Sequence, residues 1–170
     1  MDMLDVIKNR RSVRSFKKTP IEQQKLDAVL KAAEWAPSAG NAQARDLILV
    51  SDPGTKEKLA SAALGQGFVS EAPIVLVVCA NRGRSAKRYG QRGRDLYSVQ
   101  DATAAVENML LAVHSMGLGA CWVGAFDEDA VKDLLSIPED VSPIAIVPIG
   151  YPAEEPHAPS RKLPLHDGKW

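Results

Sequence analysis

The chain has 170 residues, and its 21 basic side chains balance its 21 acidic ones, so the formal net charge is zero. Hydrophobic residues make up 45% and charged residues 25%, which argues against a disordered chain and against a nucleic-acid partner bound through bulk charge. The length predicts a single domain over residues 1–170. Two cysteines are too few for a disulfide scaffold, so we expect a reducing, cytoplasmic location. The first residues lack the apolar core of a signal peptide, and the longest apolar run, 74–80, is too short to cross a membrane.

The first half of the chain alternates helices and strands. Residues 2–9 predict a short helix, and Thr19 is expected to cap a second helix over 20–35, where apolar residues recur at helical spacing. A short apolar strand follows at 47–50, and Asp52 begins a helix that ends near residue 64.

The second half continues the alternation. A β-branched strand at 74–78 is expected to be central. Residues 81–94 carry six bases and no acid, and we interpret them as a mobile loop. The remaining predicted elements are a long helix at 97–116, a strand at 120–125, a helix from Asp127 to 136, and a strand at 144–149. The order predicts an α/β or α+β fold with about four strands, and the tail 151–170 is expected to lie across a partner.

A basic segment near the N-terminus could bind an anion. Three guanidiniums and one hydroxyl lie within five positions, in Arg10, Arg11, Ser12 and Arg14. In an extended segment Arg10, Ser12 and Arg14 point the same way, which favours a multi-donor site for a phosphate. The alternative is a solvated basic turn.

Two further segments combine small residues with hydrogen-bonding groups. The first is the loop of Pro37, Ser38, Ala39, Gly40 and Asn41, which either approaches a ligand or only ends a helix. The second contains the spaced glycines of 117–125. These follow a helix and enter a strand, the reverse of a dinucleotide-binding turn, so we reject a Rossmann site. The small strand end at Gly124 and Ala125 could present backbone N–H groups to a flat ligand.

No side chain stands out as an acid, base, nucleophile or metal ligand. Cys79 and Cys121 lie in apolar segments and are expected to be core thiols. The three histidines lack ligand spacing, so we expect no metal site. Asp101 and Glu107 are six positions apart on one helix, which disfavours a carboxylate pair. An anion site without catalytic side chains suits an enzyme whose cofactor performs the reaction.

Taken in order, these segments resemble the nitroreductase family of flavin enzymes. The resemblance rests on RRSVRSF at 10–16, PSAGNAQ at 37–43, the long helix opening with Asp101, GLGACWVGAFD at 117–127, and GYP…PSRKLP at 150–164. It implies an α+β fold, with a mixed sheet of four to five strands flanked by helices in an intertwined homodimer. It also implies FMN-dependent, ping-pong hydride transfer from NAD(P)H through flavin N5 to a small acceptor such as a nitroaromatic or a quinone.

The resemblance also implies which residues bind FMN, and it names no catalytic residue. Arg10, Arg11, Ser12 and Arg14 match the first flavin segment, and Arg161 matches a late residue that closes on the phosphate. The loop from Pro37 to Asn41 matches one that the other subunit supplies. The matches near the ring are Gln66, at the pyrimidine edge, and Val123, Gly124 and Ala125, whose backbone N–H groups face flavin N5 and O4.

The chain departs from the family pattern after Asn41. A Gln followed by Pro-Trp or Pro-Phe is usual there, whereas this chain has Gln43-Ala44-Arg45-Asp46. The chain is also short, and the basic segment 81–94 could serve as a lid that meets an anionic co-substrate. Two other functions remain open: a flavin-binding or flavin-processing protein without acceptor turnover, and a non-enzymatic anion-binding module.

Overall fold

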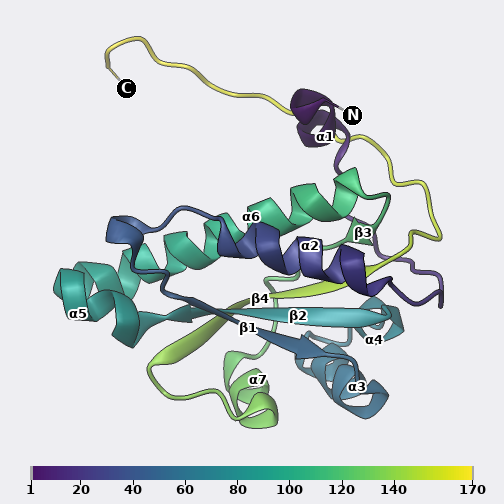
Figure 1. Cartoon of the computed structure of the whole chain (residues 1–170), viewed down its shortest axis with the longest axis horizontal. Coiled ribbons are helices and arrows are strands. Elements are labelled where there is room, and N and C mark those ends of the chain that lie inside the picture. Colours follow the sequence, from purple (N-terminus) through teal and green to yellow (C-terminus); the bar gives the residue numbers. More distant parts are fainter. Residues whose placement is uncertain (1, 170) are drawn as a thin grey trace.

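A four-stranded sheet forms the centre of the molecule. A computed structural model describes residues 2–169, and its strands are β1 (Arg45–Val50), β2 (Ile74–Asn81), β3 (Gly119–Ala120) and β4 (Val141–Gly150). They lie in the order β1-β2-β4-β3, and each neighbouring pair is antiparallel (Figure 1). One parallel pairing is added by an isolated bridge between Ser12 and Ala120. The predicted α+β class and strand number are therefore confirmed.

The strand β2 is central, as its apolar sequence predicts. Ile48 of β1 and Ile146 of β4 lie on either side of Val77. Six consecutive residues of β2, from Val75 to Ala80, are no more than 1% exposed. Because successive side chains point to opposite faces, β2 contributes to both hydrophobic cores.

One face of the sheet is covered by α2 (Gln23–Glu34) and α6 (Ser98–Ser115). The apolar stripes that the sequence predicts for both helices point into this core, where Val29, Val106 and Met109 are almost fully buried. The other face is covered by α3 (Pro53–Ala62), α4 (Phe68–Glu71) and α7 (Glu128–Leu135).

The predicted caps are confirmed for two helices and wrong for a third. The side chains of Asp52 and Asp127 accept from backbone N–H groups of α3 and α7. Thr19 does not cap α2, because that helix begins at Gln23, with Glu22 in the cap position and no side-chain hydrogen bond. The predicted strand 120–125 is also too long, since β3 ends at Ala120 and only an isolated bridge joins Val123 to Ile146.

The interpretation of 81–94 as a mobile loop is wrong. The segment forms α5 (Arg82–Arg92) and continues as a short π-helix, η2 (Gly93–Tyr97), before α6. The Asn81 side chain caps α5 by accepting from the backbone N–H of Arg84 at 2.9 Å. A Cβ on Gly93 would lie 2.6 Å from the Ser85 carbonyl oxygen, so the absence of a side chain lets η2 pack closely on α5.

The two ends of the described chain extend from this body. The short helix α1 (Met3–Asn9) packs on α6. After β4, residues 153–169 form no helix or strand, and this tail passes α1 and runs away from the sheet (Figure 1). Its Leu163 and Leu165 are 88% and 90% exposed. No helix within residues 2–169 is long and apolar enough to span a membrane.

Candidate functional site

The basic segment 10–14 is fastened to the edge of the sheet. The backbone N–H of Val13 donates to the carbonyl of Ala120 at 2.9 Å, and the Val13 side chain is buried. A Cβ on Gly119 would lie 2.7 Å from Val13 Cγ2, so glycine permits this close approach. The backbone at this edge therefore fixes where the neighbouring arginines begin.

Four of the predicted phosphate ligands line one cavity of about 400 Å³. They are Arg11, Ser12 and Arg14 from the basic segment and Arg161 from the tail, and we call this the arginine cavity. No carboxylate among residues 2–169 forms an ion pair with any of these arginines. Three guanidiniums that form no such ion pair, beside a hydroxyl, provide donors for a phosphate.

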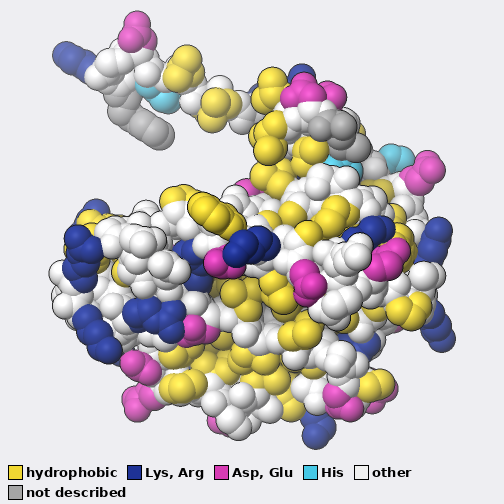
Figure 2. All heavy atoms as spheres, in the orientation of Figure 1, with side chains coloured by type: hydrophobic (Ala, Val, Ile, Leu, Met, Phe, Trp, Pro, Cys, Tyr) yellow, Lys and Arg dark blue, Asp and Glu magenta, His cyan; other side chains and the backbone are white. Residues whose placement is uncertain are grey.

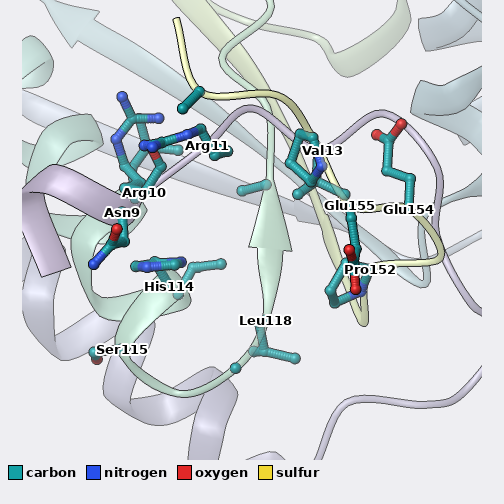
Figure 3. A pocket seen from close by; sticks show the side chains of 16 residues that line it. Asn9, Arg10, Arg11, Val13, His114, Ser115, Leu118, Pro152, Glu154 and Glu155 are labelled. Atoms are coloured by element: carbon teal, nitrogen blue, oxygen red, sulfur yellow. The ribbon is translucent and has the colours of Figure 1, made fainter. Parts of the chain in front are cut away.

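Arg10 does not line this cavity, so the structure does not bring it together there with Ser12 and Arg14. It lines a larger neighbouring cavity of about 650 Å³, between the basic segment, the end of α6 and the start of the tail. Figure 3 shows Arg10, Arg11 and His114 on one side of this cavity and Glu154 and Glu155 on the other. Arg11 contributes to both cavities, and its Nη1 donates to the Lys8 and Arg10 carbonyls at 2.6 and 2.8 Å.

Burial dominates the electrostatics of the neighbouring titratable groups. Desolvation raises the pKa of the Cys121 thiol, although Arg14, Ser12 and Arg10 act in the opposite direction. Desolvation also lowers the pKa of His114, whose Nε2 is buried without a hydrogen-bond partner within residues 2–169. Both groups are therefore neutral at pH 7, and neither is a ready nucleophile or acid.

The two predicted ring-binding positions lie next to each other. The Gln66 side-chain amide donates to the Ala125 carbonyl at 3.2 Å. Val123 is buried and pairs with Ile146 in both directions at 2.9 Å, whereas Gly124 and Ala125 are exposed. Within residues 2–169, no protein group accepts a hydrogen bond from the N–H of Gly124 or Ala125. These two N–H groups are thus available to a ligand.

The loop of Pro37, Ser38, Ala39, Gly40 and Asn41 lies elsewhere, near the start of α6. It includes a short 3-10 helix, η1 (Ala39–Asn41), and Arg88 of α5 donates to the Gly40 carbonyl at 2.6 Å. The larger cavity, by contrast, is lined by His114, in the last turn of α6. An 18-residue helix spans about 27 Å, so one chain does not bring the loop to the arginine cavity.

Sequence reasoning missed a buried ion pair behind this loop. Asp101 is no catalytic carboxylate, because it pairs with Arg45, and the two side chains are 2% and 5% exposed. The sequence held a signal at Asp101, which is the one charged residue on the buried face of its helix. Cys79 is a core thiol as expected, and burial raises its pKa to about 12. Within the described chain, no cluster of three or more metal-ligating side chains occurs.

Comparison with known proteins agrees with this fold. The model of the "Nitroreductase family" matches residues 7–71 and 60–151. A "Putative NADH dehydrogenase/NAD(P)H nitroreductase" of Methanothermobacter thermautotrophicus is 36% identical, over 100% of this chain and 88% of the relative. An "FMN reductase (NADPH)" of Bacillus subtilis is 31% identical, over 88% of this chain and 66% of the length of that relative.

A solved structure extends the similarity to three dimensions. The NADPH:FMN oxidoreductase from Vibrio harveyi, complexed with NAD+, superposes with a TM-score of 0.89 at 26% identity, over 99% of this chain and 77% of that one. The fold and the site thus define a class of NAD(P)H-dependent oxidoreductases. The chain belongs to the nitroreductase family.

Proposed function

We propose that the chain is an FMN-dependent NAD(P)H oxidoreductase that acts as a homodimer on a small organic acceptor. The observation that carries this proposal is the arginine cavity, which Arg11, Ser12, Arg14 and Arg161 line and in which no guanidinium forms an ion pair within residues 2–169. The Glu154 carboxylate accepts the backbone N–H of Arg14 at 2.5 Å and leaves the guanidinium available. A phosphate monoester carries about 1.5 to 2 negative charges at pH 7, which suits three guanidiniums.

The residues present also fit the rest of FMN. Gln66 would bind the pyrimidine edge, and the free N–H groups of Gly124 and Ala125 would face N5 and O4. When bound, FMN supplies the two-electron chemistry, in which hydride enters from NAD(P)H and leaves to the acceptor in two successive half-reactions, a ping-pong cycle. The chain's own part is to orient the ring and to direct N–H donors and positive charge at the edge where negative charge develops.

The distance between the two predicted flavin segments supports the proposed dimer. Since they lie at opposite ends of α6, both contact one FMN only if the loop from Pro37 to Asn41 comes from a second copy. The exposed tail leucines, Leu163 and Leu165, and the exposed apolar side of α1 with Met3, Leu4 and Ile7 provide surface for that copy.

The first experiment is a visible spectrum of the purified protein together with its mass in solution. We expect the yellow flavin bands, a dimer, and NAD(P)H consumption that increases when a quinone or a nitroaromatic is supplied. A yellow protein that does not consume NAD(P)H when either acceptor is supplied would indicate a flavin-binding or flavin-processing role. A colourless monomer that takes up no FMN when supplied in excess would overturn the proposal.

A further inference from the structure

The loop that precedes β1 has an unusual backbone. Gly40, Asn41 and Gln43 adopt positive φ values of 54°, 56° and 49°. Glycine tolerates this left-handed conformation, but side-chain-bearing residues rarely adopt it, and it persists only where the surroundings hold it. Two of the three residues here bear side chains, so other contacts must fix the loop.

A buried ion pair holds the end of this loop. Arg45, the first residue of β1, and Asp101, in the first turn of α6, pair with 5% and 2% of their side chains exposed. The same carboxylate accepts the backbone N–H of Ala44, the residue that follows the loop. Arg45 Nη2 donates to the carbonyls of Glu34 and Ala36 at 2.7 and 3.0 Å, where α2 ends.

This pair therefore ties three elements together at one point. Arg45 binds the backbone where the chain leaves α2, and Asp101 binds the Ala44 N–H just before the chain enters β1. The donation from Ala44 requires a residue with a backbone N–H, which proline lacks. A buried ion pair gives little net stability compared with apolar packing, whereas its directional bonds fix geometry.

A second arginine holds the same point from the outer side. Arg84 of α5 donates to the Gln43 carbonyl at 2.6 Å and pairs with Asp46 at 2.8 Å. Within the loop, the Ser38 hydroxyl accepts the N–H of Gln43 at 3.0 Å. The strained residue Gln43 is thus fixed through both of its backbone polar groups.

We propose that Arg45 and Asp101 are positioning residues, which set the shape of the loop 38–43 that each chain contributes to the flavin site of its partner. The inference rests on the proposed function, since it takes the loop to act across the dimer. It assigns the pair no contact with FMN or with substrate. The pair acts on the flavin only through the loop backbone.

The first test is Asp101→Asn, which keeps the size of the side chain and removes the charge that receives Arg45 and the Ala44 N–H. We expect the Kd for FMN to rise at least tenfold, with kcat almost unchanged at saturating FMN. Arg45→Lys keeps the charge but loses the planar guanidinium. Its Kd for FMN should lie between those of wild type and Asp101→Asn.

A matched control removes a buried charge from the other face of the sheet. Lys56 of α3 is 8% exposed and donates to the Ala72 carbonyl at 2.7 Å. Lys56→Met should lower the thermal midpoint and leave the Kd for FMN within a factor of two. If Asp101→Asn and Lys56→Met change the Kd for FMN equally, the positioning role is wrong and the pair is merely structural.

The decisive experiment uses mixed dimers, isolated with two affinity tags, of one Asp101→Asn chain and one Arg14→Ala chain. If Asp101 acts across the dimer, one site receives both defects and the other receives none. At an FMN concentration a few-fold above the wild-type Kd, we then expect one FMN per mixed dimer and little in either variant homodimer.

Three outcomes decide the matter. One FMN per mixed dimer supports the proposal. If wild type binds FMN, two results overturn the positioning role of Asp101. One is a mixed dimer without FMN, and the other is an Asp101→Asn homodimer that binds FMN as tightly as wild type does. A wild-type protein that binds no FMN overturns the proposed function instead.

Discussion

The arginine segment 10–14 and the loop 38–43, which the proposed dimer brings to one flavin, are built in opposite ways. The backbone of the arginine segment is held at the sheet edge by the hydrogen bond from Val13 to Ala120. Its guanidiniums form no ion pair within residues 2–169. The loop has no sheet partner over Gly40 and Asn41, and charged side chains from α5 and α6 bind the backbone around it.

The difference separates charges that bind a ligand from charges that hold a backbone. Arg14 is exposed and lines a cavity. Arg45 is buried, and its guanidinium donates to two backbone carbonyls and pairs with a carboxylate. We therefore expect substitutions in the arginine segment to change FMN binding directly. Substitutions around the loop should act through the shape of the backbone.

The largest expected effect sharpens the first half of this comparison. Arg14→Ala removes a guanidinium that is unpaired in the arginine cavity, and a charged hydrogen bond to phosphate contributes about 1.5–3 kcal/mol. The Kd for FMN should rise roughly 10- to 150-fold, measured by flavin fluorescence titration. The thermal midpoint without FMN should stay unchanged, because Arg14 makes no ion pair among the described residues.

Lys18→Ala provides the control for charge alone. Lys18 is exposed, lies four positions further along the chain and lines neither of the two cavities. It should bind FMN as wild type does. If Arg14→Ala also retains full yellow occupancy on dilution, the assignment of the arginine cavity to phosphate is wrong.

The sequence predicted the elements better than the contacts between them. The apolar periods of α2 and α6 and the β-branched run of β2 are local signals, and the structure confirms them. The helix α5 escaped prediction because it contains almost no apolar residues. Only Ser85 is buried in it, and the remainder is held by capping, by the edge-to-face contact of Tyr89 with Tyr97, and by arginine bonds to the loop.

The second prediction would break the loop without removing a charge. Gly40 has a φ of 54°, and an added Cβ would collide with the Tyr89 hydroxyl and lie 2.6 Å from Arg88 Cζ. Both atoms end flexible side chains, so they can move, but the bond from Arg88 to the Gly40 carbonyl is then lost. Gly40→Ala should cost about 1–2 kcal/mol of unfolding free energy, measured by urea titration.

A matched glycine separates this contact from backbone strain alone. Gly65 has a φ of 76° and no atom within 4 Å of an added Cβ. Gly65→Ala should therefore lose stability while FMN binding is kept, whereas Gly40→Ala should lose both. Equal Kd values for FMN in the two variants would contradict a role for the Arg88 contact.

The sequence predicted which segments form the candidate site, but not where these segments lie relative to each other. The donor types in 10–14 and 37–41 are visible in the sequence, yet nothing local shows that these segments lie at opposite ends of α6. The sequence also does not show that Arg10, at the end of α1 and just before the bridge of Ser12 with β3, lines a different cavity. Long-range placement depends on packing, which a single sequence does not state.

The third prediction tests whether the basic surface of α5 receives an anionic co-substrate. The five basic side chains of α5 and Arg94 of η2 lie at the end of the molecule beside the loop (Figure 2). Arg88→Glu with Arg92→Glu also removes the bond from Arg88 to the Gly40 carbonyl, so the variant is assayed at saturating FMN. It should raise the KM for NAD(P)H several-fold at low salt, and the difference should shrink at high salt.

The control for this charge reversal is Lys17→Glu with Lys18→Glu, which makes the same change of net charge far from α5. It should leave the KM values near wild type. If neither the KM for NAD(P)H nor that for the acceptor changes in Arg88→Glu/Arg92→Glu, the basic surface takes no part in substrate binding.

The smallest expected effect concerns His114, on the arginine-segment side of the comparison. Burial lowers its pKa below 6.5, and Arg10 and Arg11 act in the same direction, while Glu154 and Glu155 line the same cavity. As the pH falls below about 6.5, the unfolded chain takes up this proton first, so the free energy of unfolding should fall and then level off below the folded pKa.

His114→Gln should remove this part of the pH dependence, which we expect to be under about 1 kcal/mol because the side chain is partly exposed. Urea titrations of wild type and His114→Gln at about pH 7.5 and about pH 5.5 measure it. A phosphate bound in the adjoining arginine cavity offsets the repulsion between the arginines and protonated His114, so FMN should reduce the dependence in wild type. An equal pH dependence with and without FMN would show that the two cavities are electrostatically independent, and the free guanidiniums would then act on the ligand alone.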